Sequence, residues 1–261
     1  MTAKEIIEKL YGEATEEVKP DSCDCLKAGN PDKEVKTVCV TMFATFDVIR
    51  TASELGADMI ITHEPLYYRH MDDAGSEMLV DAKKAFLEQC GITVYRYHDH
   101  PHYSFPDIIN EGELRKLKLD GKIVHTGRLG VTDIILDEPK TAREIAETCK
   151  KNLNIECVRI AGAADIKSNI VTFTPGALGD RVLDELRRSD SQIVICGETC
   201  EWAICEYTRD ACQFGLNKSL IPLGHAVSER DGMEYAAEIL REMLPEIRVE
   251  YIDCENVFKF I

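Results

Sequence analysis

The sequence predicts an α/β protein built from two intertwined, duplicated α/β units with mixed sheets. Short apolar runs with the length of buried strands alternate with amphipathic helical segments along the chain. The order of these elements in the first half recurs after Gly130, which is the pattern of an internal duplication. The chain has 261 residues, and a single core stops growing efficiently near ~250 residues, so two units are favoured.

In the first half, a capping-box pattern predicts the first helix. Thr2 is followed three residues later by Glu5, and apolar residues then recur at helical spacing. Residues 21–32 mix Ser, Cys, Asp, Gly and Pro without periodicity, so we expect a loop there. Apolar runs at residues 38–42, 59–62 and 92–97 predict buried strands, and the helices between them are expected to end at Gly56 and Gly91.

The second half repeats this order. Thr141 and Glu144 form another capping-box pattern, and strands are expected at residues 170–173 and 193–196. Residues 57–64 correspond to residues 191–198, and each half continues through a helix into a strand that is followed by a histidine. A last amphipathic helix over residues 233–244 and a strand over residues 249–252 complete the chain. We expect residues 1–128 plus about 216–261 to form the first unit and residues 129–215 the second.

Charge and composition exclude several classes of protein. The chain has 31 Lys and Arg against 47 Asp and Glu, a net charge of −16 that disfavours binding to nucleic acid and to anionic membranes. No run approaches the ~20 apolar residues of a membrane helix, and the start has no apolar signal region, so we expect a cytoplasmic protein. Eleven cysteines, an odd number in a long chain, are expected to be reduced thiols.

The residues that follow the predicted strands carry most of the candidate chemistry. Ligands of α/β sheets bind beyond the carboxyl ends of the strands, and these positions are rich in imidazoles and carboxylates. They are His63, Glu64, His98, Asp99, His100, His102, Glu198, His225 and Glu229. Such mixtures suit zinc, iron or manganese. Ser228 is expected to cap the helix that begins at this point. In the structural alternative, His225 is a packed core histidine and Glu229 complements the dipole of that helix. The pair at residues 63–64 is then part of a turn.

Other motifs in the sequence give weaker evidence for a functional site. Cys23 and Cys25 offer two thiols in a loop, but they lack the companion pair that a structural zinc site requires, and a redox pair is the alternative. His70 and His125 stand apart from the other histidines and are expected at the surface. The sequence has no Gly-rich phosphate loop and no nucleophile elbow, so nucleotide cofactors are not indicated.

Three of these segments resemble motifs of one family over nearly the whole chain. Residues 61–65 (Ile-Thr-His-Glu-Pro) are similar to Ile-Thr-His-His-Pro, and residues 98–102 (His-Asp-His-Pro-His) are similar to His-Thr-Asn-Leu-Asp. Residues 224–229 keep the pattern Gly-His-x-x-x-Glu. The chain thus resembles the Nif-three-like family of dinuclear-metal, toroidal, hexameric proteins, often labelled type 2 GTP cyclohydrolase I homologues.

The resemblance implies a site with two divalent metal ions, and the departures from the family motifs modify it. The second histidine of the first motif is Glu64 here, and the aspartate of the second motif is His102. We interpret this as a reciprocal exchange that keeps three imidazoles and two carboxylates. The implied ligands are His63, Glu64, His102, His225 and Glu229, with His98 as an alternative or supporting ligand.

The resemblance also implies two alternative functions. The first is a metal-dependent hydrolase of unknown small-molecule substrate. From their positions in the chain, Asp99 or Glu198 is the candidate general base, and Arg69, Arg96 or Arg230 is the candidate for holding an anionic group. The second is a non-enzymatic metal-binding toroid that handles metal or docks a protein partner. A structural α/β protein with ordinary polar loops is the third reading. In the first two, the family implies a homo-oligomer, expected to be a hexamer.

Overall fold

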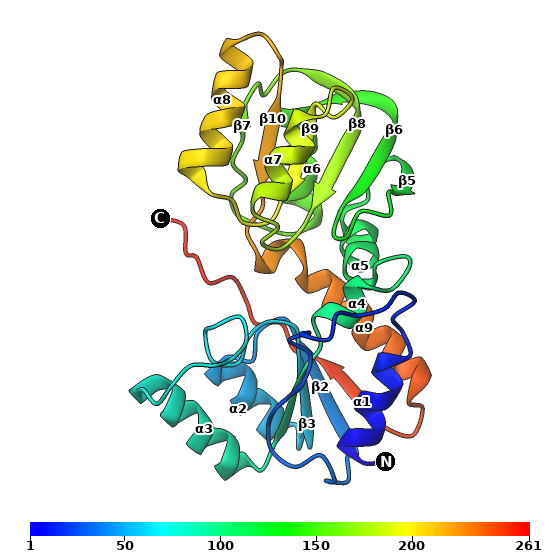
Figure 1. Ribbon diagram of the computed structural model, residues 1–261, viewed down its shortest axis with the longest axis vertical. Coiled ribbons are helices and arrows are strands. Elements are labelled where there is room, and N and C mark those ends of the chain that lie inside the picture. Colours follow the sequence, from blue (N-terminus) through cyan, green and yellow to red (C-terminus); the bar gives the residue numbers. More distant parts are fainter. The chain divides into compact units, whose positions relative to one another are not determined.

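The computed structural model describes residues 1–261 and divides them into two compact units. The first unit comprises residues 1–109 and 232–255, and the second comprises residues 110–231 and 256–261. Each unit contains one mixed sheet with helices packed on it (Figure 1), which confirms the predicted fold class.

The first unit is built on a five-stranded sheet with the order β1-β4-β3-β2-β11. The strands are β1 (Leu26–Ala28), β2 (Thr37–Thr41), β3 (Met59–Thr62), β4 (Thr93–Arg96) and β11 (Arg248–Tyr251). Strands β4, β3, β2 and β11 run parallel, and β1 pairs antiparallel with β4 at the edge. Strand β1 lies inside the segment predicted as a loop, because an edge strand of three residues leaves no hydrophobic period to detect.

Helices cover both faces of this sheet. They are α1 (Ala3–Tyr11), α2 (Phe46–Glu54), α3 (Met78–Cys90), α4 (Asp99–His102) and, with its first two residues in the second unit, α9 (Arg230–Met243). The capping box of Thr2 and Glu5 is present, and α3 ends at Gly91 in the left-handed conformation, as the sequence predicts.

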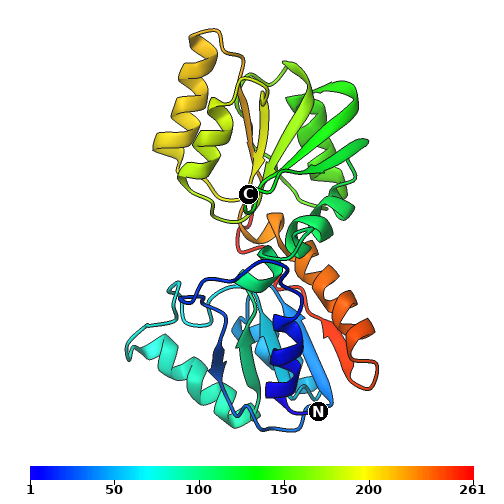
Figure 2. The same ribbon diagram turned by 45° about the vertical axis from the view of Figure 1, so that its right-hand side comes forward.

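Alternate residues of the strands face different helices. Cys39, Ile60 and Val94 pack in one cluster with apolar residues of α2 and α3. On the other face, the ring of Tyr95 meets the ring of Tyr11 on α1, with 6.3 Å between centroids. Figure 2 shows α1 lying along this face of the sheet.

The second unit is built on a six-stranded sheet with the order β5-β6-β8-β9-β10-β7. The strands are β5 (Gly121–His125), β6 (Thr132–Thr141), β7 (Ala161–Gly162), β8 (Lys167–Thr174), β9 (Ile193–Cys196) and β10 (Ser219–Pro222). Strands β8, β9 and β10 run parallel, whereas β5, β6 and β7 join by antiparallel pairing.

Helices also cover both faces of the second sheet. They are α5 (Ile108–Leu117, its first two residues in the first unit), α6 (Ala142–Asn152), α7 (Asp180–Arg187), the π-helix η1 (Glu201–Cys205), α8 (Glu206–Gln213) and the 3₁₀ helix η2 (Ala226–Ser228). Ile193 and Ile195 pack with α6, whereas Val194 and Cys196 pack with α7. This alternation has the period of two that a strand buried on both faces requires.

Each of the two sheets contains three neighbouring parallel strands. In the first unit these are β2, β3 and β4, and in the second unit they are β8, β9 and β10, with β3 and β9 in the centre. The structure places residues 110–128, 216–231 and 256–261 in the second unit, whereas the predicted division assigned them to the first. For the first two of these segments the reason is strand pairing, since β5 pairs with β6 and β10 pairs with β9.

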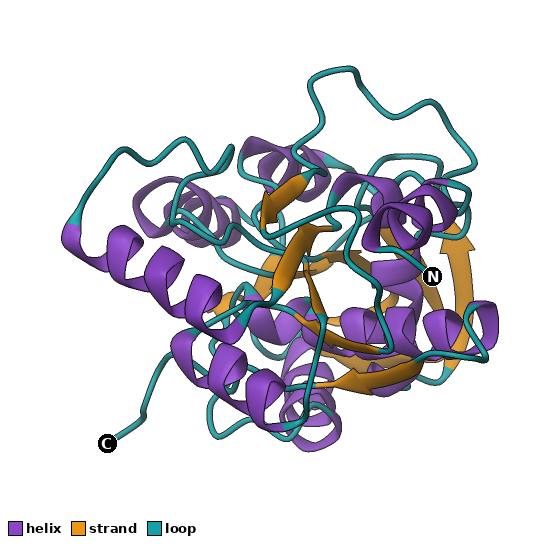
Figure 3. Cartoon of the chain, turned by 90° about the horizontal axis from the view of Figure 1, so that it is seen from below, coloured by secondary structure: helices purple, strands orange, loops and turns teal.

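The chain continues beyond β11 as a loop (Figure 3). None of the helices combines the length and the apolar character that a membrane crossing requires.

Candidate metal centre

Within the first unit, the ends of two neighbouring strands bring the predicted site residues together. Strands β3 and β4 are parallel, and Thr62 pairs with Arg96 at their carboxyl ends. The residues that follow, His63 after β3 and the segment 97–102 after β4, therefore lie side by side. The Nδ1 atom of His63 is 3.0 Å from the carbonyl oxygen of Tyr97.

Three imidazoles gather at this edge. The ring of His63 lies 4.5 Å from that of His98 and 5.2 Å from that of His102, and the rings of His98 and His102 are 5.4 Å apart, measured between centroids. One ring nitrogen of each residue can be chosen so that all three lie within 4.8 Å of one another. The group has the donor type and spacing that a zinc, iron or manganese ion accepts.

The other ring nitrogen of each histidine is held by an oxygen. Nδ1 of His63 faces the Tyr97 carbonyl, Nδ1 of His98 lies 2.8 Å from Oδ1 of Asp99, and Nδ1 of His102 lies 2.9 Å from Oδ2 of Asp107. A carbonyl or carboxylate oxygen accepts, so Nδ1 donates in each case and Nε2 keeps its lone pair in the neutral ring. Metal-binding histidines in proteins have this arrangement.

Burial keeps His63 in the form that binds a metal. Its side chain is fully buried, and burial together with the neighbouring His98 and His102 lowers the pKa of His63 well below its ordinary value. The ring is therefore neutral at physiological pH.

The loop that carries His98 is fixed by Asp24. Its buried carboxylate accepts hydrogen bonds from the backbone N–H groups of residues 98, 99 and 100, at 2.7–2.9 Å. It also accepts from Nδ1 of His100 at 2.7 Å, while the His100 ring stacks on Tyr11, 4.4 Å away. His100 thus faces α1. Sequence reasoning missed Asp24 and Asp107 as supporting residues, because only the folded chain shows which histidine each carboxylate meets.

The two predicted carboxylates of this segment have different surroundings. Glu64 is buried, with one oxygen 3.4 Å from Nη2 of Arg96 and the other 3.6 Å from Nε2 of His98. Asp99 is half-buried, which by itself would raise its pKa, but hydrogen bonds from His98, Ser22 and the Cys23 N–H hold the pKa of Asp99 below its usual range.

The expectation for His70 is confirmed only in part. Its side chain is exposed, as predicted, but it does not stand apart from the other histidines, since its ring lies 6.0 Å from that of His98. The loop that follows Pro65 returns to the strand ends, as Nη1 of Arg96 bonds to the carbonyl of His70. No pattern in the sequence indicates that this loop comes back to the ends of β3 and β4.

A second group of donors lies within the second unit. His225 follows β10 after Gly224, whose φ of +98° favours glycine. Nδ1 of His225 is 3.1 Å from Oε2 of Glu198, and Nε2 is 3.2 Å from Oε2 of Glu229. The carboxylate of Glu229 is buried, whereas the side chain of Glu198 is 61% exposed.

The lack of a side chain at Gly176 leaves space for the carboxylate of Glu229. A Cβ atom on Gly176, which follows β8, would lie 2.4 Å from Oε1 of Glu229, and its φ is +62°. Ser228, predicted as a helix cap, accepts instead from the Gly176 N–H and donates to the carbonyl of His225. It therefore ties the His225 loop to the loop after β8, and α9 begins beyond it.

The predicted anion-binding arginines lie in different settings. Arg230 is mostly buried, and its Nη2 donates to the carbonyl of Leu153 at 2.8 Å. Arg69 is exposed on the loop that follows Pro65.

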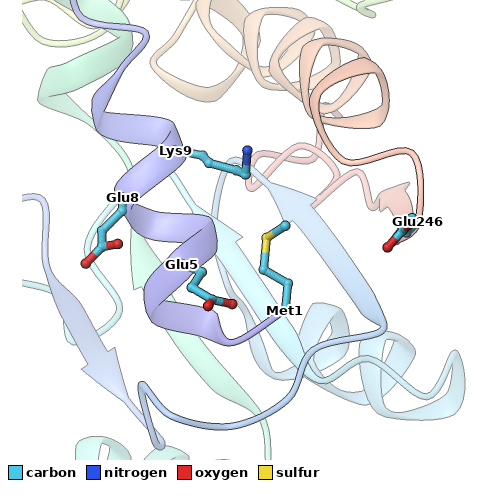
Figure 4. Close-up of a pocket in the computed structure, with 5 residues that line it drawn as sticks. All are labelled: Met1, Glu5, Glu8, Lys9 and Glu246. Carbon is cyan, nitrogen blue, oxygen red and sulfur yellow. The ribbon is translucent and has the colours of Figure 1, made fainter.

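A surface pocket of about 620 Å³ lies elsewhere in the first unit. Its lining, drawn in Figure 4, comes from the N-terminal residue, α1 and the turn before β11: Met1, Glu5, Glu8, Lys9 and Glu246. It contains no imidazole or thiol and none of the predicted site residues.

Known proteins share this arrangement of strands. A profile of the family described as Duf34/NIF3 (NGG1p interacting factor 3) matches residues 1–257. The chain belongs to the DUF34/NIF3 family. The resemblance seen in the sequence is thereby confirmed.

The relatives of this family member are distant in sequence. A Clostridium perfringens protein named "GTP cyclohydrolase 1 type 2 homolog" is 24% identical over 245 residues, 90% of each chain. A Clostridium acetobutylicum protein of the same name is 24% identical over 212 residues, 78% of this chain and 76% of the relative. A Bacillus cereus protein related to NIF3 has the same fold, with a TM-score of 0.80 at 14% identity, covering 100% of this chain and 99% of that one. A Staphylococcus aureus protein gives a TM-score of 0.77 at 17% identity, with the same coverage.

Proposed function

We propose that this DUF34/NIF3 protein binds a divalent transition-metal ion through His63, His98 and His102 and is a metal-dependent hydrolase. The observation that carries the proposal is the orientation of the three imidazoles. Each Nδ1 donates to an oxygen, so in the neutral ring Nε2 is the nitrogen that carries the lone pair with which a histidine binds a metal ion. Neutral imidazoles suit zinc, iron or manganese, the metals expected from the sequence.

His225 and Glu229 supply a second set of donors in the proposal. Glu198 holds His225 in the same way that Asp99 and Asp107 hold the histidines of the first unit. Two metal ions per chain, with Glu64 among the ligands, remains a prediction from the family resemblance. The buried carboxylate of Glu64 near His98 supports its inclusion.

The proposed chemistry divides among a few residues. A divalent ion bound by imidazoles acts as a Lewis acid and activates water for attack on a substrate. Asp99 orients His98 and is engaged by several hydrogen bonds, whereas Glu198 has an exposed carboxylate. We therefore favour Glu198 over Asp99 as the general base. Of the three predicted arginines, exposed Arg69 is better placed to hold a substrate anion. Arg230 binds Leu153, and Arg96 is buried beside Glu64.

Metal content and hydrolysis together test the proposal. Protein purified without an affinity tag or added metal is analysed for bound elements, next to the His102→Ala and His225→Ala variants. His125→Ala, which changes a histidine of β5 outside both donor groups, is the control. We expect metal in the parent and the control and less in each variant. Hydrolysis of a generic phosphoester should fall in parallel.

Two other outcomes are informative. Metal bound with turnover no faster than background would support the alternative, a non-enzymatic metal-binding protein that handles metal or docks a protein partner. A metal-free parent that also fails to take up zinc, iron and manganese would contradict the proposal. Assembly as a hexamer remains a prediction, and a size-exclusion mass of the same samples tests it.

A further inference from the structure

Cys23 lies beside His98 and Asp99 in the first unit. It precedes the edge strand β1, whose Leu26 pairs with Tyr95 of β4 and so brings residues 21–25 to the segment after β4. The Sγ atom of Cys23 is 3.7 Å from Oδ1 of Asp99, and the Cys23 N–H donates to Oδ2 of Asp99 at 3.3 Å. The companions that the cysteine motif lacks in the sequence are thus supplied by a segment about 75 residues away.

The three residues together have the donors of a metal site. Sγ of Cys23, a ring nitrogen of His98 and a carboxylate oxygen of Asp99 lie within 4.8 Å of one another. Sulfur, nitrogen and oxygen donors of this kind bind zinc, and three protein ligands leave a fourth position open. The Cys23 side chain is buried, but those of His98 and Asp99 are 22% and 24% exposed, so an ion can approach from their side.

The surrounding loops hold these donors in place. Asp24, next to Cys23, accepts the N–H groups of His98 and Asp99 with its buried carboxylate. The backbone carbonyl of Cys25 accepts from the N–H of Arg96, the last residue of β4. The segment with the thiol and the segment with the imidazole are therefore cross-linked through Asp24 and Cys25, directly after Cys23, and the site needs no large rearrangement to bind an ion.

The two nitrogens of His98 face different partners. Nδ1 lies against Asp99 on the side of Cys23, whereas Nε2 lies 3.6 Å from Oε1 of Glu64. We propose that Cys23, Asp99 and Nδ1 of His98 form a thiolate-containing site for a thiophilic divalent ion, of which zinc and cadmium are the chemical type. In binding, the sulfur–metal bond forms as the thiol proton leaves to solvent. The imidazole proton passes through solvent from Nδ1 to Nε2.

The thiolate site is an alternative to the three-imidazole centre. When Nε2 of His98 carries the proton, His98 no longer serves His63 and His102. Thiolate ligands favour zinc and cadmium, whereas manganese prefers oxygen and nitrogen donors. Cys23 therefore decides which metal the first unit selects.

Cadmium and manganese titrations test this inference. Cadmium bound to thiolate is followed by its sulfur-to-metal charge-transfer absorption in the ultraviolet, and manganese binding by its electron paramagnetic resonance. In Cys23→Ser we expect most of the charge-transfer absorption at one equivalent of cadmium to be lost. Cadmium affinity should fall about tenfold or more, since even partners of metal ligands change affinity by about 10–100-fold. Manganese affinity should be unchanged. Cys25→Ser, which removes an exposed thiol two residues away, should behave as the parent.

Equal charge-transfer absorption and cadmium affinity in the parent and Cys23→Ser would overturn the inference. Should Cys23→Ser fail to fold by circular dichroism, Asp99→Asn replaces it, and unchanged cadmium affinity there would overturn the inference equally. His102→Ala separates it from the proposed function. That variant should lose manganese affinity and keep the Cys23-dependent absorption, and a loss of that absorption would count against a separate site.

Discussion

Oδ2 of Asp107 accepts a hydrogen bond from Nδ1 of His102 at 2.9 Å, while Oδ1 of the same carboxylate accepts from the N–H of Ile109 at 2.9 Å. The side chains of both Asp107 and His102 are 12% exposed. A single aspartate therefore anchors the first turn of α5 and sets the orientation of the imidazole.

We expect Asp107→Asn to weaken metal binding while the protein stays folded. The amide oxygen can still accept from Ile109, but the uncharged amide binds the His102 N–H less strongly and no longer supports the basicity of Nε2. Affinity for zinc should fall about 10–100-fold. Isothermal titration measures the affinity. Asp165→Asn, which alters an exposed aspartate paired with Arg143, is the control and should match the parent. Equal affinity in both variants would mean that Asp107 does not support a ligand.

Asp24→Asn tests the loop that carries His98. The buried carboxylate accepts three backbone N–H groups and the His100 ring, and an amide would turn its NH₂ group toward at least one of these donors. Hydrogen bonds to charged groups contribute about 1.5–3 kcal/mol each, and we expect the free energy of unfolding to fall by about 2 kcal/mol or more. Urea denaturation measures this. Asp21→Asn, at an exposed position three residues earlier, should change it by less than ~0.5 kcal/mol.

The fold could be predicted from sequence wherever a segment has a strong local pattern. Strand β3 falls on the expected residues, and both capping boxes are present, since each depends on residues that are close in the chain. The edge strands β1, β5 and β7 and the strand β6 were not predicted. Strands β1 and β7 have only two or three residues, which carry no period. The boundaries of the units depend on strand pairing over long separations, which local patterns do not contain.

The same distinction applies to the candidate site. His63, His98 and His102 were found because they lie in the segments that follow strands whose apolar runs are evident in the sequence. The partners of these histidines were not found. Asp107 and Asp24 are ordinary loop aspartates until the chain folds, and Cys23 meets Asp99 only through the pairing of β1 with β4.

Lys83 should make the stability of the first unit depend on pH in the alkaline range. Its ammonium is buried, donates to the carbonyl of Leu66 at 3.0 Å and lies 4.6 Å from the centre of the Tyr68 ring. Burial lowers the pKa of Lys83 from 10.5 to about 8, although Asp72 opposes the shift. Between about pH 8 and 10.5 the unfolded chain therefore holds more protons at this position than the folded one does.

The contribution of Lys83 to stability consequently rises with pH through that window and is least favourable below pH 8. We expect the free energy of unfolding of the parent, minus that of Lys83→Met, to increase from pH 8 to 10.5. Urea denaturation at a series of pH values measures it. Lys84→Met, at the exposed neighbouring position, should show no such increase relative to the parent. A pH-independent difference for Lys83→Met would show that folding does not lower the pKa of Lys83.

Gly176→Ala should disturb the donor group of the second unit. A Cβ atom at this position would lie 2.4 Å from Oε1 of Glu229, and the φ of +62° adds backbone strain. Gly179→Ala is a control for backbone strain, because its φ is also positive, +58° with a ψ of −127°, and nothing lies within 4 Å of its Cβ position. We expect the control to lose about 1–3 kcal/mol of stability from backbone strain alone. Gly176→Ala should lose about 1–3 kcal/mol more, since the buried carboxylate must move.

The same pair of variants separates stability from metal binding. If Glu229 is a ligand, Gly176→Ala should retain less metal per folded chain than Gly179→Ala, because the displaced carboxylate no longer lies 3.2 Å from Nε2 of His225. Elemental analysis of the folded fraction at a temperature well below both midpoints gives the comparison. The two variants could instead contain equal metal while Gly176→Ala still loses more stability. Glu229 would then have a structural role beside Gly176 and would not bind metal together with His225.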